Sequence, residues 1–122
     1  MMNRKKKIVI VGGGLAGLAL AMKFCERNGE VTVVSYQSLK RSHSVCAQGG
    51  INAATDAKNE GDTPEKHFYD TIKGGDFLAH QPLVRDMCYQ APTIIHLMDR
   101  MGVAFNRTGE GHLDFRRFGG TL

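Results

Sequence analysis

The stretch IVIVGGGLAG, residues 8–17, decides the fold of this 122-residue chain. Four consecutive β-branched residues are typical of a parallel strand that is buried on both faces. They lead directly into the pattern G-x-G-x-x-G, whose first glycine permits a tight turn and whose second lets the backbone approach a pyrophosphate group. The third glycine allows the following helix to pack closely on the strand. We therefore predict a dinucleotide-binding turn built on Gly12, Gly14 and Gly17.

The residues after the glycines complete a β-α-β unit. Apolar residues at helical spacing predict a helix that begins at Leu15 and stops at Asn28-Gly29. Its predicted apolar face consists of Leu18, Ala19, Met22 and Cys25. Residues 31–34, VTVV, then predict a second parallel strand. A glycine motif in this complete context is a strong signal, whereas the motif alone is a weak one.

The second predicted strand ends in Ser35, where an Asp or Glu usually binds the adenosine ribose of NAD. A hydroxyl can still donate or accept there, but it lacks the paired oxygens of a carboxylate. NAD binding is therefore disfavoured. Because no Arg or Lys stands at this strand end, a 2′-phosphate site is unsupported as well.

Composition places the chain among globular proteins, since 42% of its residues are hydrophobic and no tract is of low complexity. No segment is long and apolar enough to span a membrane. The net charge of +4 is modest and the aromatic residues are scattered, so nucleic-acid binding is disfavoured. Cys25, Cys46 and Cys88 are odd in number and lack metal-ligand spacing. This favours a reducing compartment and predicts neither a disulfide framework nor a metal site.

The remaining chain predicts helices and loops without a third clear β-run. Asp62 or Thr63 is suited to cap a helix that contains Pro64 and ends at Gly74-Gly75. The further predicted elements are a helix over residues 82–89, a helix over 92–98 that stops at Gly102, a short strand over 103–105, and a loop or weak hairpin over 112–118. The predicted fold class is α/β, a Rossmann-like β-α-β start followed by helices and loops, with an incomplete parallel sheet.

Several blocks of sequence carry a family resemblance that covers most of the chain. They are residues 9–17, 41–52 (RSHSVCAQGGIN), 74–78 (GGDFL), 94–103 (IIHLMDRMGV) and 115–121 (FRRFGGT). Through these blocks the chain resembles the N-terminal part of the flavoprotein subunit of succinate dehydrogenase or fumarate reductase. The second and last blocks are specific to that family. Its members commonly end the second strand in Ser, which accounts for Ser35.

The resemblance implies that the cofactor is FAD and assigns residues to it. Its pyrophosphate would be held by Gly12, Gly13, Gly14, Leu15, Ala16 and Gly17. Its adenosine and isoalloxazine portions would be lined by Ser35, Arg41, Ser42, Ser44, Ala47, Gln48, Gly49 and Gly50. The resemblance further implies that Gln48 and Gly49 run toward a dicarboxylate substrate, with Phe118 as an aromatic at the substrate face.

The resemblance also implies that His43 bonds covalently to the 8α-carbon of the flavin. A neutral imidazole nitrogen is a nucleophile near neutral pH, so this chemistry is reasonable. The bond should raise the flavin potential, which suits removal of a hydride from an unactivated dicarboxylate. Composition alone would favour a loop histidine that only hydrogen-bonds, and the surrounding motif reverses that preference.

We expect residues 1–122 to be the N-terminal segment of an FAD-binding domain, with the capping and C-terminal domains outside it. The family's catalytic residues lie in those absent parts, so no catalytic residue is assigned within this chain. The complete subunit would oxidise succinate to fumarate, or the reverse. The implied partners are an iron–sulfur subunit and membrane anchor subunits, which would hold a cytoplasmic flavoprotein at the cell membrane.

Two alternatives stay open at the level of sequence. The first is a noncovalent FAD relative such as L-aspartate oxidase, which shares the glycine turn and Ala-Gln-Gly-Gly but lacks a histidine at position 43. The second is a nucleotide-binding fragment without activity in isolation. His43 separates the first alternative from the succinate dehydrogenase interpretation, and the residues beyond position 122 would separate the second.

Overall fold

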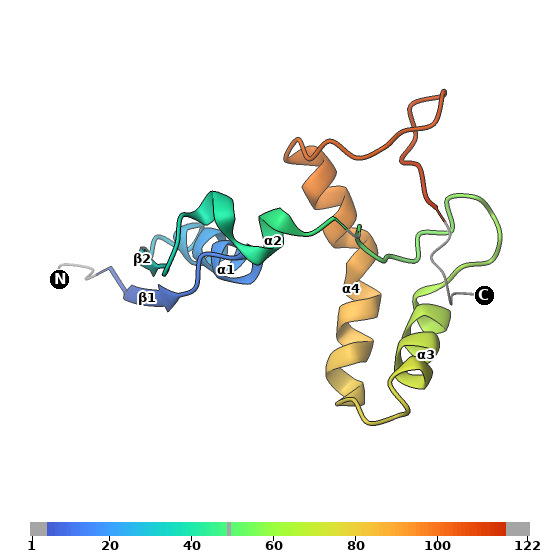
Figure 1. Ribbon diagram of the computed structural model, residues 1–122, viewed down its shortest axis with the longest axis horizontal. Coiled ribbons are helices and arrows are strands. Elements are labelled where there is room, and N and C mark those ends of the chain that lie inside the picture. The colour runs from blue at the N-terminus through green and yellow to red at the C-terminus, as the bar shows by residue number, and fades with distance from the viewer. Residues whose placement is uncertain (1–4, 49, 117–122) are drawn as a thin grey trace. The chain divides into compact units, whose positions relative to one another are not determined.

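A computed structural model describes residues 5–48 and 50–116 of the chain. The chain divides into two compact units, Met1–Gly50 and Ile51–Leu122. The first unit contains β1 (Lys7–Val11), α1 (Leu15–Cys25), β2 (Glu30–Val34), the short 3-10 helix η1 (Leu39–Arg41) and the one-turn helix α2 (His43–Cys46). The second contains α3 (Pro64–Gly74) and α4 (Gln81–Arg100). Figure 1 labels both strands and the helices α1 to α4.

The first unit is a β-α-β crossover, as predicted. β1 and β2 pair in parallel, with a register that runs from Lys7 opposite Glu30 to Val11 opposite Val34. An ion pair of 2.6 Å joins the side chains of Lys7 and Glu30 at the start of this ladder. The Lys7 ammonium holds the pKa of the Glu30 carboxyl below its ordinary value, first by hydrogen bonding and then by its charge.

The face that α1 turns toward the sheet differs from the predicted one. Half-buried side chains occur at Leu18, Ala21 and Phe24, whereas Ala19, Met22 and Cys25 are exposed. The buried side of α1 therefore includes Gly17, which packs against the turn after β1. It is not the side that carries the most hydrophobic residues. Phe24 lies directly over Gly29, where a β-carbon would overlap its ring. Gly29 is thus required by packing as well as by the end of the helix.

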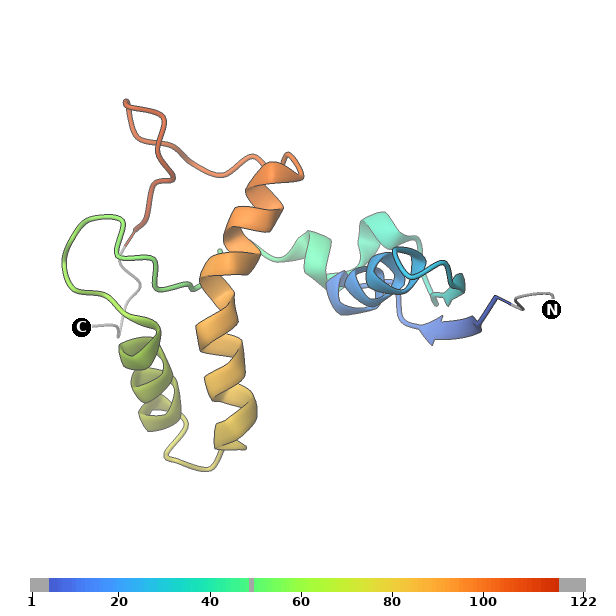
Figure 2. The same cartoon turned by 180° about the vertical axis from the view of Figure 1, so that it is seen from behind.

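The second unit is a helical hairpin in which α3 and α4 lie side by side in both views (Figures 1 and 2). The Thr63 hydroxyl caps α3 by accepting the backbone N–H of Lys66 at 3.2 Å, so this predicted boundary is correct. The predicted strand over residues 103–105 is wrong, since these residues have no regular secondary structure and follow the turn at Met101 and Gly102. One antiparallel bridge joins Arg107 to Leu113, so the paired residues begin before the predicted loop or weak hairpin over 112–118, whose last two residues lie outside the described part of the chain.

The prediction of two helices over residues 82–98 is wrong, because α4 continues through Pro92 for 20 residues. A proline inside a helix removes one hydrogen bond and crowds the preceding turn, at a cost of about 3 kcal/mol. Packing offsets that cost here. Cys88 is fully buried and Ile95 is 5% exposed. They stand seven residues apart on one face of α4, on both sides of Pro92, so burying this face favours one helix over two.

The parallel sheet is incomplete in the described part of the chain, where it has two strands. The chain exposes 10216 Å² in total. Two compact domains of 50 and 72 residues would together expose only about 7,800 Å² by the relation between surface and mass. Large apolar residues contribute to the excess, among them Val11, which is 85% exposed on β1, and Leu78, which is 88% exposed after α3.

Two classes of feature are absent from the described residues. No helix among them has the length and apolar character needed to cross a bilayer. Nor do they bring together three or more His, Cys, Asp or Glu side chains in a group that could hold a metal ion.

We expect Pro92→Ala to stabilise α4. The substitution returns the N–H that the Cys88 carbonyl lacks, so the free energy of local opening should rise by about 1–3 kcal/mol. Amide hydrogen exchange of the α4 segment, measured by mass spectrometry in the complete flavoprotein, tests this. Thr93→Ala, at an exposed neighbouring position, is the matched control and should change the opening free energy by about 0.5 kcal/mol or less. Faster exchange in the Pro92 variant would contradict the account of α4.

We expect the isolated 122-residue chain to be marginally stable and prone to aggregate, because it leaves apolar surface uncovered. Light scattering should detect oligomers, and a hydrophobic dye should bind without added denaturant. A monodisperse monomer that unfolds in one cooperative thermal transition would show that the two units bury enough surface by themselves.

Candidate functional site

The glycine turn lies at the carboxyl ends of β1 and β2, where parallel sheets present ligand sites. Gly12 follows β1 directly and has a φ of +119°, a conformation that other residues rarely adopt. Its backbone N–H donates a 2.8 Å hydrogen bond to the carbonyl oxygen of Val34, the last residue of β2. The turn is therefore fixed to both strands.

Close packing accounts for two more glycines of the motif. A β-carbon on Gly17 would overlap the carbonyl oxygen of Gly12, so only glycine lets α1 start this close to the turn. Gly13 is buried, and a β-carbon there would overlap the side chain of Leu39 and crowd the hydroxyl of Ser35. Leu39 had no predicted role. Its only sequence signal is that it is an apolar residue in a polar connection.

The start of α1 presents unpaired donors. The backbone N–H groups of Gly13, Gly14, Ala16 and Gly17 donate to no residue that the structure describes. Such groups, together with the positive end of the helix dipole, form an anion site suited to a phosphate. This arrangement fits the pyrophosphate of a dinucleotide. The N–H of Leu15 differs from the others because it donates to the Ser44 hydroxyl at 2.9 Å.

The connection that follows β2 contains two short helices where the sequence predicted only a loop. η1 begins after Ser38, and α2 follows after Ser42. Ser42 is nearly buried, its N–H donates to the Leu39 carbonyl, and its own carbonyl accepts the N–H groups of Val45 and Cys46. His43 is the first residue of α2 and is exposed. The local fold thus presents the histidine to solvent on an ordered turn.

The first unit brings together some of the predicted cofactor residues and leaves others apart. Ser35 lies beside Gly13, and Ser44 lies beside Gly14. Four further predicted residues are exposed without a described contact to the glycine turn, namely Arg41, Ala47, Gln48 and Gly50. Gly49 and Phe118 lie outside the described residues.

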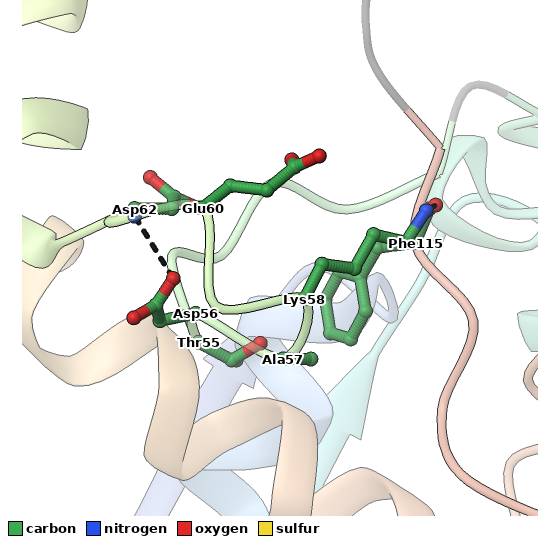
Figure 3. A pocket seen from close by; sticks show the side chains of 7 residues that line it. All are labelled: Thr55, Asp56, Ala57, Lys58, Glu60, Asp62 and Phe115. Atoms are coloured by element: carbon green, nitrogen blue, oxygen red, sulfur yellow. Dashed lines mark hydrogen bonds between the residues drawn. The ribbon is translucent and has the colours of Figure 1, made fainter.

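Two cavities of the second unit contain none of the predicted cofactor residues. The smaller, of about 60 Å³, is shown in Figure 3. There the Asp56 carboxylate accepts the backbone N–H groups of Gly61 and Asp62, and Lys58 reaches the Phe115 carbonyl. The larger, of about 430 Å³, contains the ion pair of Asp99 with Arg107. Hydrogen bonds within the chain thus occupy the polar groups Asp56, Lys58, Asp99 and Arg107.

A parallel β-α-β unit with this glycine turn and these free amide groups defines a dinucleotide-binding protein. A family model described as an FAD binding domain matches residues 7–122. The chain belongs to this FAD binding domain family, so its dinucleotide is FAD. This confirms the cofactor and the fold class that the sequence predicted.

The resemblance drawn from the sequence blocks is confirmed by individual relatives. The chain is 62% identical to the succinate dehydrogenase flavoprotein subunit of Bacillus subtilis, over 96% of this chain and 20% of that protein. It is 42% identical to the corresponding subunit of Coxiella burnetii, over 92% of this chain and 19% of that protein. The chain thus spans about a fifth of the length of these relatives.

Solved structures give the same result. The Mycobacterium smegmatis Sdh1 complex in the apo form contains a chain that matches 96% of this one at 33% identity, with a TM-score of 0.88. A variant of the E. coli quinol fumarate reductase matches 95% of it at 34% identity, with a TM-score of 0.82. In each case the match covers 20% of the other chain.

We expect Gly14→Val to abolish FAD binding in the complete flavoprotein. A single β-carbon at this position would already lie 3.2 Å from the Ser44 hydroxyl oxygen, and the branched side chain would also fill the space that the pyrophosphate needs. The measurement is flavin content per protein after purification. Gly109→Ala is the control, because a β-carbon at Gly109 meets no atom within 4 Å and flavin content should be unchanged. Full flavin content in the Gly14 variant would refute the assignment of the phosphate turn.

Proposed function

We propose that the complete flavoprotein that carries this chain interconverts succinate and fumarate, with FAD bonded to His43. The observation that carries the proposal is the 62% identity to a succinate dehydrogenase flavoprotein subunit. It is supported by the exposure of His43 on α2. The next residue, Ser44, contacts the start of α1 through its hydroxyl.

The residues of this chain bind and orient the cofactor. The glycine turn and the free N–H groups at the start of α1 hold the pyrophosphate. Ser35, at the end of β2, offers a hydroxyl to the adenosine portion. Bound FAD supplies the chemistry, because its isoalloxazine ring can accept a hydride from the substrate carbon. Gln48, Gly49 and Phe118 are proposed to contact the dicarboxylate.

His43 forms a covalent bond from an imidazole nitrogen to the 8α-carbon of the isoalloxazine. The nitrogen and the carbon would each give up one proton, and the two electrons of the former C–H bond would pass to bound FAD and from it to a two-electron acceptor such as fumarate or dioxygen. The exposure of His43 at the start of α2 leaves its imidazole accessible for this reaction.

The partners follow from the same proposal. The matched structures belong to the Mycobacterium smegmatis Sdh1 complex and to a quinol fumarate reductase of E. coli. We propose that electrons leave this flavoprotein through an iron–sulfur subunit and pass to quinone, and that membrane anchor subunits hold the assembly at the cytoplasmic face of the cell membrane. The flavoprotein would then be peripheral to the bilayer.

We expect His43→Ser to retain FAD only noncovalently, because the glycine turn is untouched and the nucleophile is absent. Wild-type protein should show flavin fluorescence in a denaturing gel, and the variant should not. A proteolytic peptide containing residues 41–48 should carry the mass of the flavin on His43. Succinate oxidation should fall more than fumarate reduction, since the flavin potential should drop without the covalent bond.

His80→Ser is the matched control for the gel, because His80 precedes α4 in the second unit and has no proposed role in attachment. It should keep covalent flavin at the wild-type level. Absence of covalent flavin from mature wild-type protein would place the chain with the noncovalent relatives, such as L-aspartate oxidase. Persistent fluorescence in the His43 variant would move the attachment to another residue.

A further inference from the structure

Helix α1 is capped by a residue far away in the sequence. Its N-cap residue is Gly14, which has no side chain to accept a hydrogen bond. The Ser44 hydroxyl takes this part by accepting the N–H of Leu15 at 2.9 Å, across 29 residues of sequence. A side-chain oxygen at a helix start stabilises the helix when it satisfies such a donor. Gly14 is needed for this contact, since a β-carbon there would crowd the Ser44 oxygen.

The same bond determines where α2 lies. A helix of four residues cannot form stably by itself, so α2 depends on its contacts with the rest of the unit. Among the described residues, Ser44 makes the one side-chain hydrogen bond that joins residues 35–48 to α1. Leu39 adds an apolar contact, but it lies on η1 and packs over Gly13. Ser44 is therefore the polar link between the glycine turn and the turn of helix that begins with His43.

We propose that Ser44 is a positioning residue for covalent attachment of FAD to His43, an inference that rests on the proposed function. With the pyrophosphate held at the start of α1, the flavin would extend from that point. The Leu15–Ser44 bond ties the residue next to His43 to the same point. Bond formation needs the reacting atoms about 3–3.5 Å apart, and a misplacement of about 1 Å can reduce a rate about 100-fold.

The role predicts a separation between binding and attachment. Ser44→Ala removes the acceptor and leaves the glycine turn and the imidazole in place. In this variant the rate of covalent attachment per molecule of bound FAD should fall at least about 10-fold relative to wild type, a larger loss than any fall in total FAD. Ser44→Thr keeps the hydroxyl, and its rate should be within about threefold of wild type.

The experiment follows covalent flavin by in-gel fluorescence and total flavin by absorbance, at fixed times after the complete flavoprotein is synthesised. Ser38→Ala is the control, because Ser38 is exposed and its side chain makes no capping hydrogen bond. It should match wild type in both measurements. If Ser44→Ala does not fold, as judged by thermal unfolding, Ser44→Cys keeps a small side chain with a weaker acceptor and should also attach flavin slowly.

Three outcomes would overturn the role of Ser44. These are attachment at the wild-type rate in the alanine variant, a threonine variant as slow as the alanine variant, and a loss of total FAD that accounts for the loss of covalent FAD. The last outcome would show that Ser44 acts in cofactor binding. Failure of the proposed function is a separate result, because it would be seen as missing covalent flavin in the wild-type protein.

Discussion

The contact between the backbone of Gly17 and the carbonyl oxygen of Gly12 is the constraint on which the first unit depends. It brings the start of α1 against the end of β1, so that the helix can cross back over the sheet and deliver β2 in parallel register. It also leaves the first N–H groups of α1 at the edge where both strands end. A larger side chain at position 17 would separate the helix from the turn and remove the phosphate site with it.

The second unit depends on a different balance. Cys88 and Ile95 are buried on one face of α4, and Ile72 of the neighbouring α3 is only 3% exposed. This burial is enough to keep α4 continuous through a residue that usually ends a helix. Local interactions stabilise the ends of the two helices. They include the Thr63 cap at the start of α3 and the ion pair between Asp99, near the end of α4, and Arg107. Packing thus determines the continuity of α4, whereas local hydrogen bonds determine where the helices begin and end.

The difference between local interactions and packing explains which features could be predicted from the sequence. The strands, the glycine turn and the Thr63 cap follow from short-range rules, because each depends on residues within a few positions. The continuity of α4 and the buried face of α1 depend on which surfaces meet in space, and sequence spacing alone assigned both wrongly. For the site, the glycine motif predicted the separate roles of Gly12, Gly14 and Gly17. No local pattern indicated Leu39 over Gly13 or the reach of Ser44 to Leu15, since both contacts join distant segments.

The three free thiols differ in exposure in a way that provides the molecule with its own reporter groups. Cys25, the last residue of α1, and Cys46, the last residue of α2, are exposed, whereas Cys88 is buried on α4. An alkylating reagent therefore meets two thiols directly and the third only when the helical hairpin opens. Alkylation of Cys88 therefore reports the opening of the helical hairpin, while Cys25 and Cys46 serve as directly accessible reference thiols. The opening of the hairpin can thus be followed in one sample without introducing any label.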